Sequence, residues 1–111
     1  MFYQPALRDH GLRHDPFKSL VVPRPIGWIS SLDAAGRANL APYSFFNAMA
    51  ADPPVVVYGT SLRPGSPERK DSHANIEATG EFVVNLATET LKQPMNASSA
   101  SLAVPSGPTW R

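Results

Sequence analysis

The 111-residue sequence contains no cysteine, and this absence excludes four kinds of site. A disulfide framework, a thiolate zinc site, an iron–sulfur cluster and a catalytic thiol all require cysteine side chains. An excess of charge of one sign is also lacking, because ten Lys and Arg against nine Asp and Glu leave a net charge of +1. The sequence therefore gives no electrostatic support for binding nucleic acid or a membrane surface.

Long apolar runs are missing as well. The first fifteen residues contain no apolar core of signal-peptide length, and no run approaches the roughly 18 residues of a membrane span. With the lack of cysteine, this predicts a soluble, cytoplasmic protein. His10 and His14 have the spacing of one helix face, but the glycine and proline around them disfavour a helix, so we expect no metal site.

Proline is the residue in excess. Twelve of the 111 residues are proline, about twice the usual share. Hydrophobic residues make up 42% of the chain, which is typical of a folded domain with many turns. We expect one domain over residues 17–99, preceded by an N-terminal arm at 1–16 and followed by an irregular tail at 100–111.

The order of turns and apolar segments predicts a mainly β fold with short helices. Residues 26–41 indicate a β-hairpin, because the turn residues at 33–36 separate two segments rich in strand formers. Residues 55–58 form an apolar run between proline and glycine, which predicts a strand buried on both faces. A further strand is expected over 81–87. Pro42 could begin a short helix that would place Ser44 and Asn47 on one side.

Polar and aromatic side chains could form a groove between the hairpin and this segment. The polar candidates are Ser30, Ser31, Ser44 and Asn47, and the apolar walls would be Trp28, Tyr43, Phe45 and Phe46. Such a groove would suit a planar aromatic cofactor that carries a phosphate. The alternative is that the aromatic residues form an ordinary core, and spacing alone does not choose between the two.

Two cations precede a predicted helix over 72–79, for which Asp71 is a candidate N-cap and Gly80 the end. Arg69, Lys70, Asp71 and Ser72 could bind an anion, because free N–H groups at a helix N-terminus attract phosphate. A solvated basic helix start is the alternative. Thr88 could cap a second helix, which Pro94 would end or kink. His73 is a candidate general base, but the sequence favours a solvated histidine at the helix start.

Five segments occur in the order and spacing of one known family. They read RPIGWIS from residue 24, NLAPYSFFN from 39, DPPVV from 52, KDS followed by NI from 70, and EFVVNL from 81. These segments resemble the flavin reductase-like family of FMN-binding split β-barrel proteins. The resemblance covers residues 17–99.

The resemblance implies a Greek-key antiparallel barrel that holds FMN at a homodimer interface. It further implies reduction of FMN by NADH or NADPH, with electrons passed to free flavin, a partner monooxygenase or another acceptor. Ser30 and Ser31 would approach the phosphate and ribityl chain. Residues 44–47 would contact the isoalloxazine edge, and residues 69–72 would form the phosphate side. Because the family's domain is longer than this chain, we expect an incomplete, C-terminally truncated barrel.

Three hypotheses remain open from the sequence. The chain is an FMN-dependent NAD(P)H oxidoreductase, a non-enzymatic or truncated FMN-binding module that needs oligomerisation, or a structural domain without a cofactor. The first needs no catalytic side chain, because hydride transfer between nicotinamide and flavin is chemistry of the cofactors. Accordingly, no acyl-transfer nucleophile or paired carboxylate stands out in the sequence.

Overall fold

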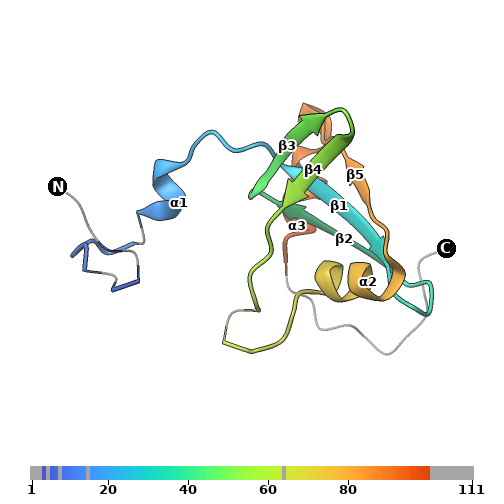
Figure 1. Cartoon of the computed structure of the whole chain (residues 1–111), viewed down its shortest axis with the longest axis horizontal. Helices are drawn as coiled ribbons and strands as arrows, with labels where there is room; N and C mark the ends of the chain where they lie inside the picture. Colours follow the sequence, from blue (N-terminus) through green and yellow to red (C-terminus); the bar gives the residue numbers. More distant parts are fainter. Residues whose placement is uncertain (1–3, 5, 8, 15, 64, 101–111) are drawn as a thin grey trace.

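The computed structural model describes residues 4, 6, 7, 9–14, 16–63 and 65–100. The expected tail lies outside these residues except for Ala100. The elements run in the order α1 (Phe17–Leu20), β1 (Gly27–Leu32), β2 (Ala38–Tyr43), β3 (Phe46–Ala51), β4 (Pro54–Tyr58), α2 (Asp71–Thr79), β5 (Val83–Asn85), a 3₁₀ turn (Glu89–Leu91) and α3 (Lys92–Ala97). Figure 1 shows α1 lying away from the strands. Antiparallel strands with short helices confirm the predicted fold class.

A three-stranded antiparallel sheet of order β2-β1-β5 forms the body of the molecule. The predicted hairpin is confirmed, with Gly27 opposite Tyr43 and Leu32 opposite Ala38. Its turn is closed by Asp33, whose carboxylate accepts hydrogen bonds from the N–H groups of Ala35 and Arg37. The hydrogen bonds with Arg37 hold the pKa of Asp33 below its usual value.

The segment after the hairpin is extended, so the predicted short helix starting at Pro42 is wrong. β2 continues through Pro42, which pairs with Trp28, and β3 begins at Phe46. Proline is tolerated there because β2 is an edge strand and needs no N–H donor on its open side. A bend at Ser44 and Phe45 leads from the three-stranded sheet into a second hairpin.

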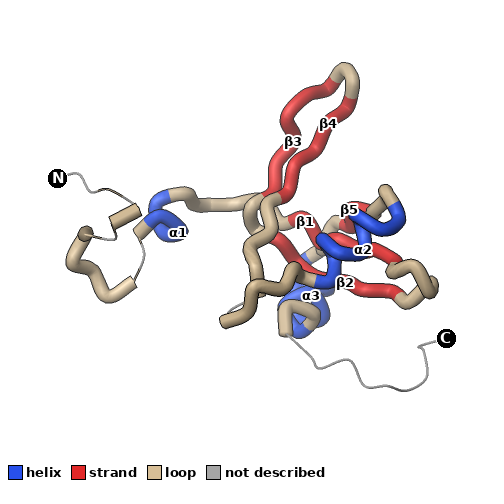
Figure 2. Tube along the Cα trace, turned by 60° about the horizontal axis from the view of Figure 1, so that its bottom comes forward, coloured by secondary structure: helices blue, strands red, loops and turns tan. Residues whose placement is uncertain are grey.

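The β3–β4 hairpin forms a separate two-stranded sheet that projects from the body (Figure 2). Its valines are partly exposed, at 43% for Val55, 44% for Val56 and 47% for Val57. The prediction that this strand is buried on both faces is therefore wrong. An apolar run shows that a strand forms, but β4 pairs only with β3 among the described residues, and no second layer covers it.

Helix α2 covers one face of the three-stranded sheet, mainly over β1. Ile29 is completely buried there, and alternate residues of β1 point to the other face. On that other face, the Trp28 indole N–H donates to the hydroxyl of Ser98, just after α3, over 2.9 Å. The sheet is thus covered by α2 on one face and approached by the end of α3 on the other.

The helix ends differ from prediction in three places. α2 ends at Gly80 as expected, with a φ of 75° and its N–H on the Ile76 carbonyl. However, Lys70 is its N-cap residue, and Asp71 lies inside the first turn. Thr88 is the N-cap residue of the 3₁₀ turn, but its side chain makes no capping bond. Pro94 lies in the first turn of α3, where the missing N–H costs no helix bond.

Within the described ranges, no helix is long and apolar enough to cross a membrane.

Candidate functional site

An open hollow of about 350 Å³ lies at the base of the β3–β4 hairpin. We call it the aromatic hollow; its lining residues are Val21, Pro23, Arg24, Pro25, Ser44, Phe45, Phe46, Asn47, Val57 and Gly59. Four of the predicted site residues, at positions 44–47, therefore share one surface. They do so because the chain bends at Ser44 and Phe45 between β2 and β3, and does not form the predicted helix there.

Close backbone contacts shape the aromatic hollow. The Gly59 N–H donates to the Phe45 carbonyl over 2.7 Å, which ties the end of β4 to the start of β3. At Gly27, a β-carbon would lie 2.6 Å from the Phe46 ring, so only glycine lets this ring pack against β1. Across the hollow, the Arg24 guanidinium lies 5.1 Å from the centre of the Phe45 ring. The lining of the aromatic hollow therefore combines aromatic surface from Phe45 with the positive charge of Arg24.

A second cation lies beside the start of the hairpin. The Lys70 ammonium is 5.6 Å from the centre of the Tyr43 ring, and Tyr43 directly precedes the hollow residue Ser44. The Tyr43 ring packs edge-on against Tyr58, with ring centres 5.0 Å apart. Burial raises the pKa of Tyr43, so its hydroxyl stays protonated at neutral pH. The predicted phosphate residue Lys70 is thereby placed next to the aromatic segment.

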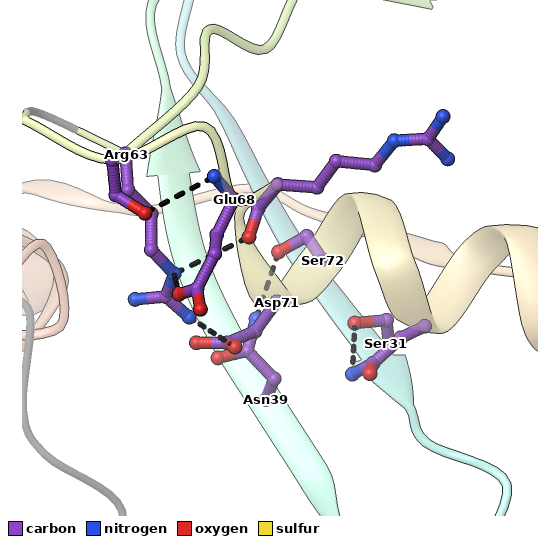
Figure 3. Close-up of polar contacts among 9 residues, drawn as sticks. Ser31, Asn39, Arg63, Glu68, Asp71 and Ser72 are labelled. Carbon is purple, nitrogen blue, oxygen red and sulfur yellow. Dashed lines mark hydrogen bonds and ion pairs between the residues drawn. The ribbon is translucent and has the colours of Figure 1, made fainter.

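The other charged residues at the start of α2 are paired with opposite charges. The Arg63 guanidinium bonds the Asp71 carboxylate and also donates to the Arg69 carbonyl over 3.2 Å (Figure 3). The Arg69 guanidinium pairs with Glu77. These ion pairs are largely exposed, and such pairs contribute little to stability. Of the two cations predicted at this helix start, Lys70 is the one directed towards the aromatic residues.

The three predicted serines outside the aromatic hollow each accept a hydrogen bond from an asparagine. The pairs are Asn85 to Ser30 at 3.1 Å, Asn75 to Ser31 at 3.2 Å and Asn39 to Ser72 at 2.7 Å. Ser30 and Ser31 both border a second hollow of about 220 Å³. Ser44 and Asn47 line the aromatic hollow instead, so the two pairs of predicted polar residues border different hollows.

Sequence reasoning missed Arg24 and the three asparagines. Arg24 is interpreted from sequence only as an extended residue before proline, because the sequence does not show that the chain folds back over Phe45. The asparagines lie in separate segments, and their only signal in the sequence is their presence in the quoted motifs.

The candidate base His73 bonds the Thr60 hydroxyl over 3.1 Å and lies 3.7 Å from Glu77. No group of three potential metal ligands occurs within residues that the structure describes.

Comparisons with known proteins relate this arrangement to flavin-linked proteins. The chain is 45% identical over 76 residues to an uncharacterized protein of Aquifex aeolicus, covering 68% of this chain and 38% of that one. The solved structure of nitrilotriacetate monooxygenase component B from Bacillus cereus superposes with a TM-score of 0.76 at 33% identity, over 91% of this chain and 50% of that one. Pseudomonas fluorescens 2-nitrobenzoate 2-nitroreductase NbaA gives a TM-score of 0.65 at 36% identity, over 74% of this chain and 38% of that one.

The chain thus spans half or less of the length of these relatives. A model of the flavin reductase like domain matches residues 19–109, past the domain boundary at 99 expected from the motifs. The likeness to the two solved structures supports a split-barrel class for the antiparallel strands. From the matched domain, the identities and the shared fold, this chain belongs to the flavin reductase-like family.

Proposed function

We propose that this chain binds FMN and, with NADH or NADPH as reductant, acts as an oxidoreductase of the flavin reductase type. The observation that carries the proposal is the juxtaposition of the aromatic hollow with Lys70. Residues 44–47 line the hollow, and the Lys70 ammonium lies over Tyr43, the residue just before them. An apolar surface for a ring system is thereby joined to a cation for a phosphate.

The residues of the aromatic hollow fit a flavin ring by their chemistry. Pro25, Phe45 and Val57 supply apolar surface, while Ser44 and Asn47 supply hydrogen-bonding groups. The volume of about 350 Å³ falls in the usual range of ligand pockets. Predominantly apolar walls with a few placed polar groups are typical of sites for small molecules and cofactors.

The residues at the start of α2 fit a phosphate. Lys70 supplies a positive charge, and the first N–H groups of a nine-residue helix supply donors with a favourable dipole. The carbonyl of Lys70 accepts bonds from the N–H groups of His73 and Ala74, so Lys70 is held by the helix itself. The proposal assigns no flavin contact to the predicted residues Trp28, Ser30 and Ser31, because none of them lines the aromatic hollow.

Lys70 and the residues of the aromatic hollow would hold FMN, and the bound cofactor would supply the chemistry of hydride transfer from a nicotinamide. The protein's own part is to bind the flavin, orient it and cover it. Phe45 and Phe46 exclude water from one side, Ser44 and Asn47 orient the ring edge by hydrogen bonds, and Lys70 neutralises the phosphate. A partner monooxygenase as acceptor belongs to this proposal and is supported by the likeness to a monooxygenase component B.

A homodimer is also part of the proposal. The β3–β4 hairpin exposes apolar side chains, including Met49 at 58%, and exposed apolar patches mark interaction surfaces. A second copy that covers this hairpin would also close the open aromatic hollow beside it. Light scattering measures the mass directly and distinguishes a dimer from a monomer.

Oxidation of NADH and NADPH, followed at 340 nm with and without added FMN, tests the activity. We expect oxidation that requires both the protein and FMN and saturates with FMN. A second candidate, a non-enzymatic FMN-binding module, needs only the aromatic hollow and the Lys70 cation. Saturable FMN binding with no nicotinamide oxidation by either reductant would decide for this second candidate.

A further inference from the structure

Helix α2 is attached to the sheet through polar side chains. Its two buried residues are Ser72, with no exposed surface, and Asn75, at 9%. Asn75 donates to Ser31 on β1, and Ser72 accepts from Asn39 on β2. Both bonds are drawn in Figure 3. The attachment therefore depends on two hydrogen bonds, and a buried polar group that loses its partner is costly.

The bond between Asn39 and Ser72 lies next to the proposed phosphate residue. Ser72 is two residues after Lys70, in the first turn of α2. Ser72 also interacts with Tyr43, whose pKa it lowers against the larger raising effect of burial, and the Lys70 ammonium lies beside the same ring. Asn39 and Tyr43 are four residues apart on β2, so they share the face that α2 covers. One buried hydroxyl thus links the strand, the aromatic ring and the start of the helix.

The exposed ion pairs at the start of α2 constrain its position less than the bond between Asn39 and Ser72. Asp71, with 48% of its side chain exposed, pairs with Arg63 on the loop that leads into α2. Exposed ion pairs of this kind are screened by solvent and contribute little. The bond from Asn39 to the buried Ser72 hydroxyl, at 2.7 Å, is therefore the contact that fixes the first turn against the sheet.

We propose that Asn39 and Ser72 are positioning residues for the proposed FMN site. They hold the first turn of α2 so that Lys70 stands beside Tyr43, and they touch no ligand atom themselves. This inference rests on the proposed function and assigns Ser72 a different role from the direct ligand that the sequence suggests. Its complete burial supports that assignment, because a ligand cannot reach a side chain without exposed surface.

The test compares FMN with riboflavin, which has the same ring and ribityl chain but no phosphate. Dissociation constants are measured by quenching of flavin fluorescence for the wild type, Asn39→Ala, Lys70→Ala and the double variant. We expect Asn39→Ala to weaken FMN binding about tenfold and riboflavin binding less than twofold. We expect the double variant to bind FMN as weakly as Lys70→Ala alone, because Asn39 acts through Lys70.

Asn85→Ala is the matched control, since Asn85 donates to Ser30 in an asparagine–serine pair that joins β1 to β5 and does not involve α2. It should leave the ratio of the two dissociation constants unchanged. If Asn39→Ala fails to fold by circular dichroism, Ser72→Ala replaces it and should change the same ratio. Equal loss of both flavins, or additive effects with Lys70→Ala, would overturn the positioning role while leaving FMN binding intact. No saturable FMN binding by the wild type would overturn the proposed function and this inference together.

Discussion

Replacing Lys70 with alanine should weaken FMN binding about 10- to 150-fold while riboflavin binding stays within about twofold of the wild type. The expected loss corresponds to about 1.5 to 3 kcal/mol, the usual contribution of a hydrogen bond to a charged group. The physical reason is the position of its ammonium group, 5.6 Å from the Tyr43 ring and next to the first turn of α2. Fluorescence titration with each flavin measures both constants.

Lys92→Ala is the control for the loss of one positive charge. Lys92 lies at the start of α3 and pairs with Glu89, so it should affect neither flavin. High salt should reduce the difference between FMN and riboflavin in the wild type, because screening weakens attraction to the phosphate. Lys70→Ala with unchanged FMN affinity would show that the phosphate is not bound at this helix start.

Replacing Ile29 with alanine should lower the free energy of unfolding by about 2 to 5 kcal/mol, the usual range for deleting a buried aliphatic side chain. Ile29 is completely buried, and Tyr43 is the other hydrophobic residue that counts as buried among the described positions. The free energy of unfolding of a small domain is about 5 to 15 kcal/mol in total, so this single change removes a large share of the stability. Urea unfolding followed by circular dichroism gives the value.

Leu32→Ala serves as the comparison for Ile29. Leu32 lies on the same strand and is 45% exposed. Its removal should change stability by less than about 1 kcal/mol, as for most exposed positions. Similar losses for both variants would contradict the assignment of the core to the face of β1 that α2 covers.

Local chemistry predicted the body of the fold. The hairpin over β1 and β2 followed from its turn, because Asp33 and Gly36 specify the reversal by themselves. The end of α2 followed from Gly80 in the same way. The segment at 42–49 was predicted as a helix because proline and a three-residue spacing are compatible with one. Whether Pro42 lies at a sheet edge is set by the neighbouring strands, which local sequence does not reveal.

Contacts between distant segments limited what could be predicted of the site. The sequence indicates the Ser44–Asn47 run and Lys70 as candidate site residues. In the structure, the Lys70 ammonium lies beside the ring of Tyr43, the residue directly before this run. The sequence suggests one groove for Ser30, Ser31, Ser44 and Asn47, whereas the first two border a different hollow from the last two. The bond between Asn39 and Ser72 joins residues 33 positions apart, so its role became visible only in the fold. The exposure of β4 was missed for the same reason, because it depends on which layer covers the strand.

Gel filtration of the purified protein after incubation with FMN tests the central claim most directly. The account predicts that visible flavin absorbance elutes with the protein after incubation with FMN. After incubation with riboflavin, less flavin should elute with the protein, since riboflavin lacks the phosphate that Lys70 would bind. Elution of all flavin in the small-molecule fraction, with protein and FMN both in the micromolar range, would contradict the account.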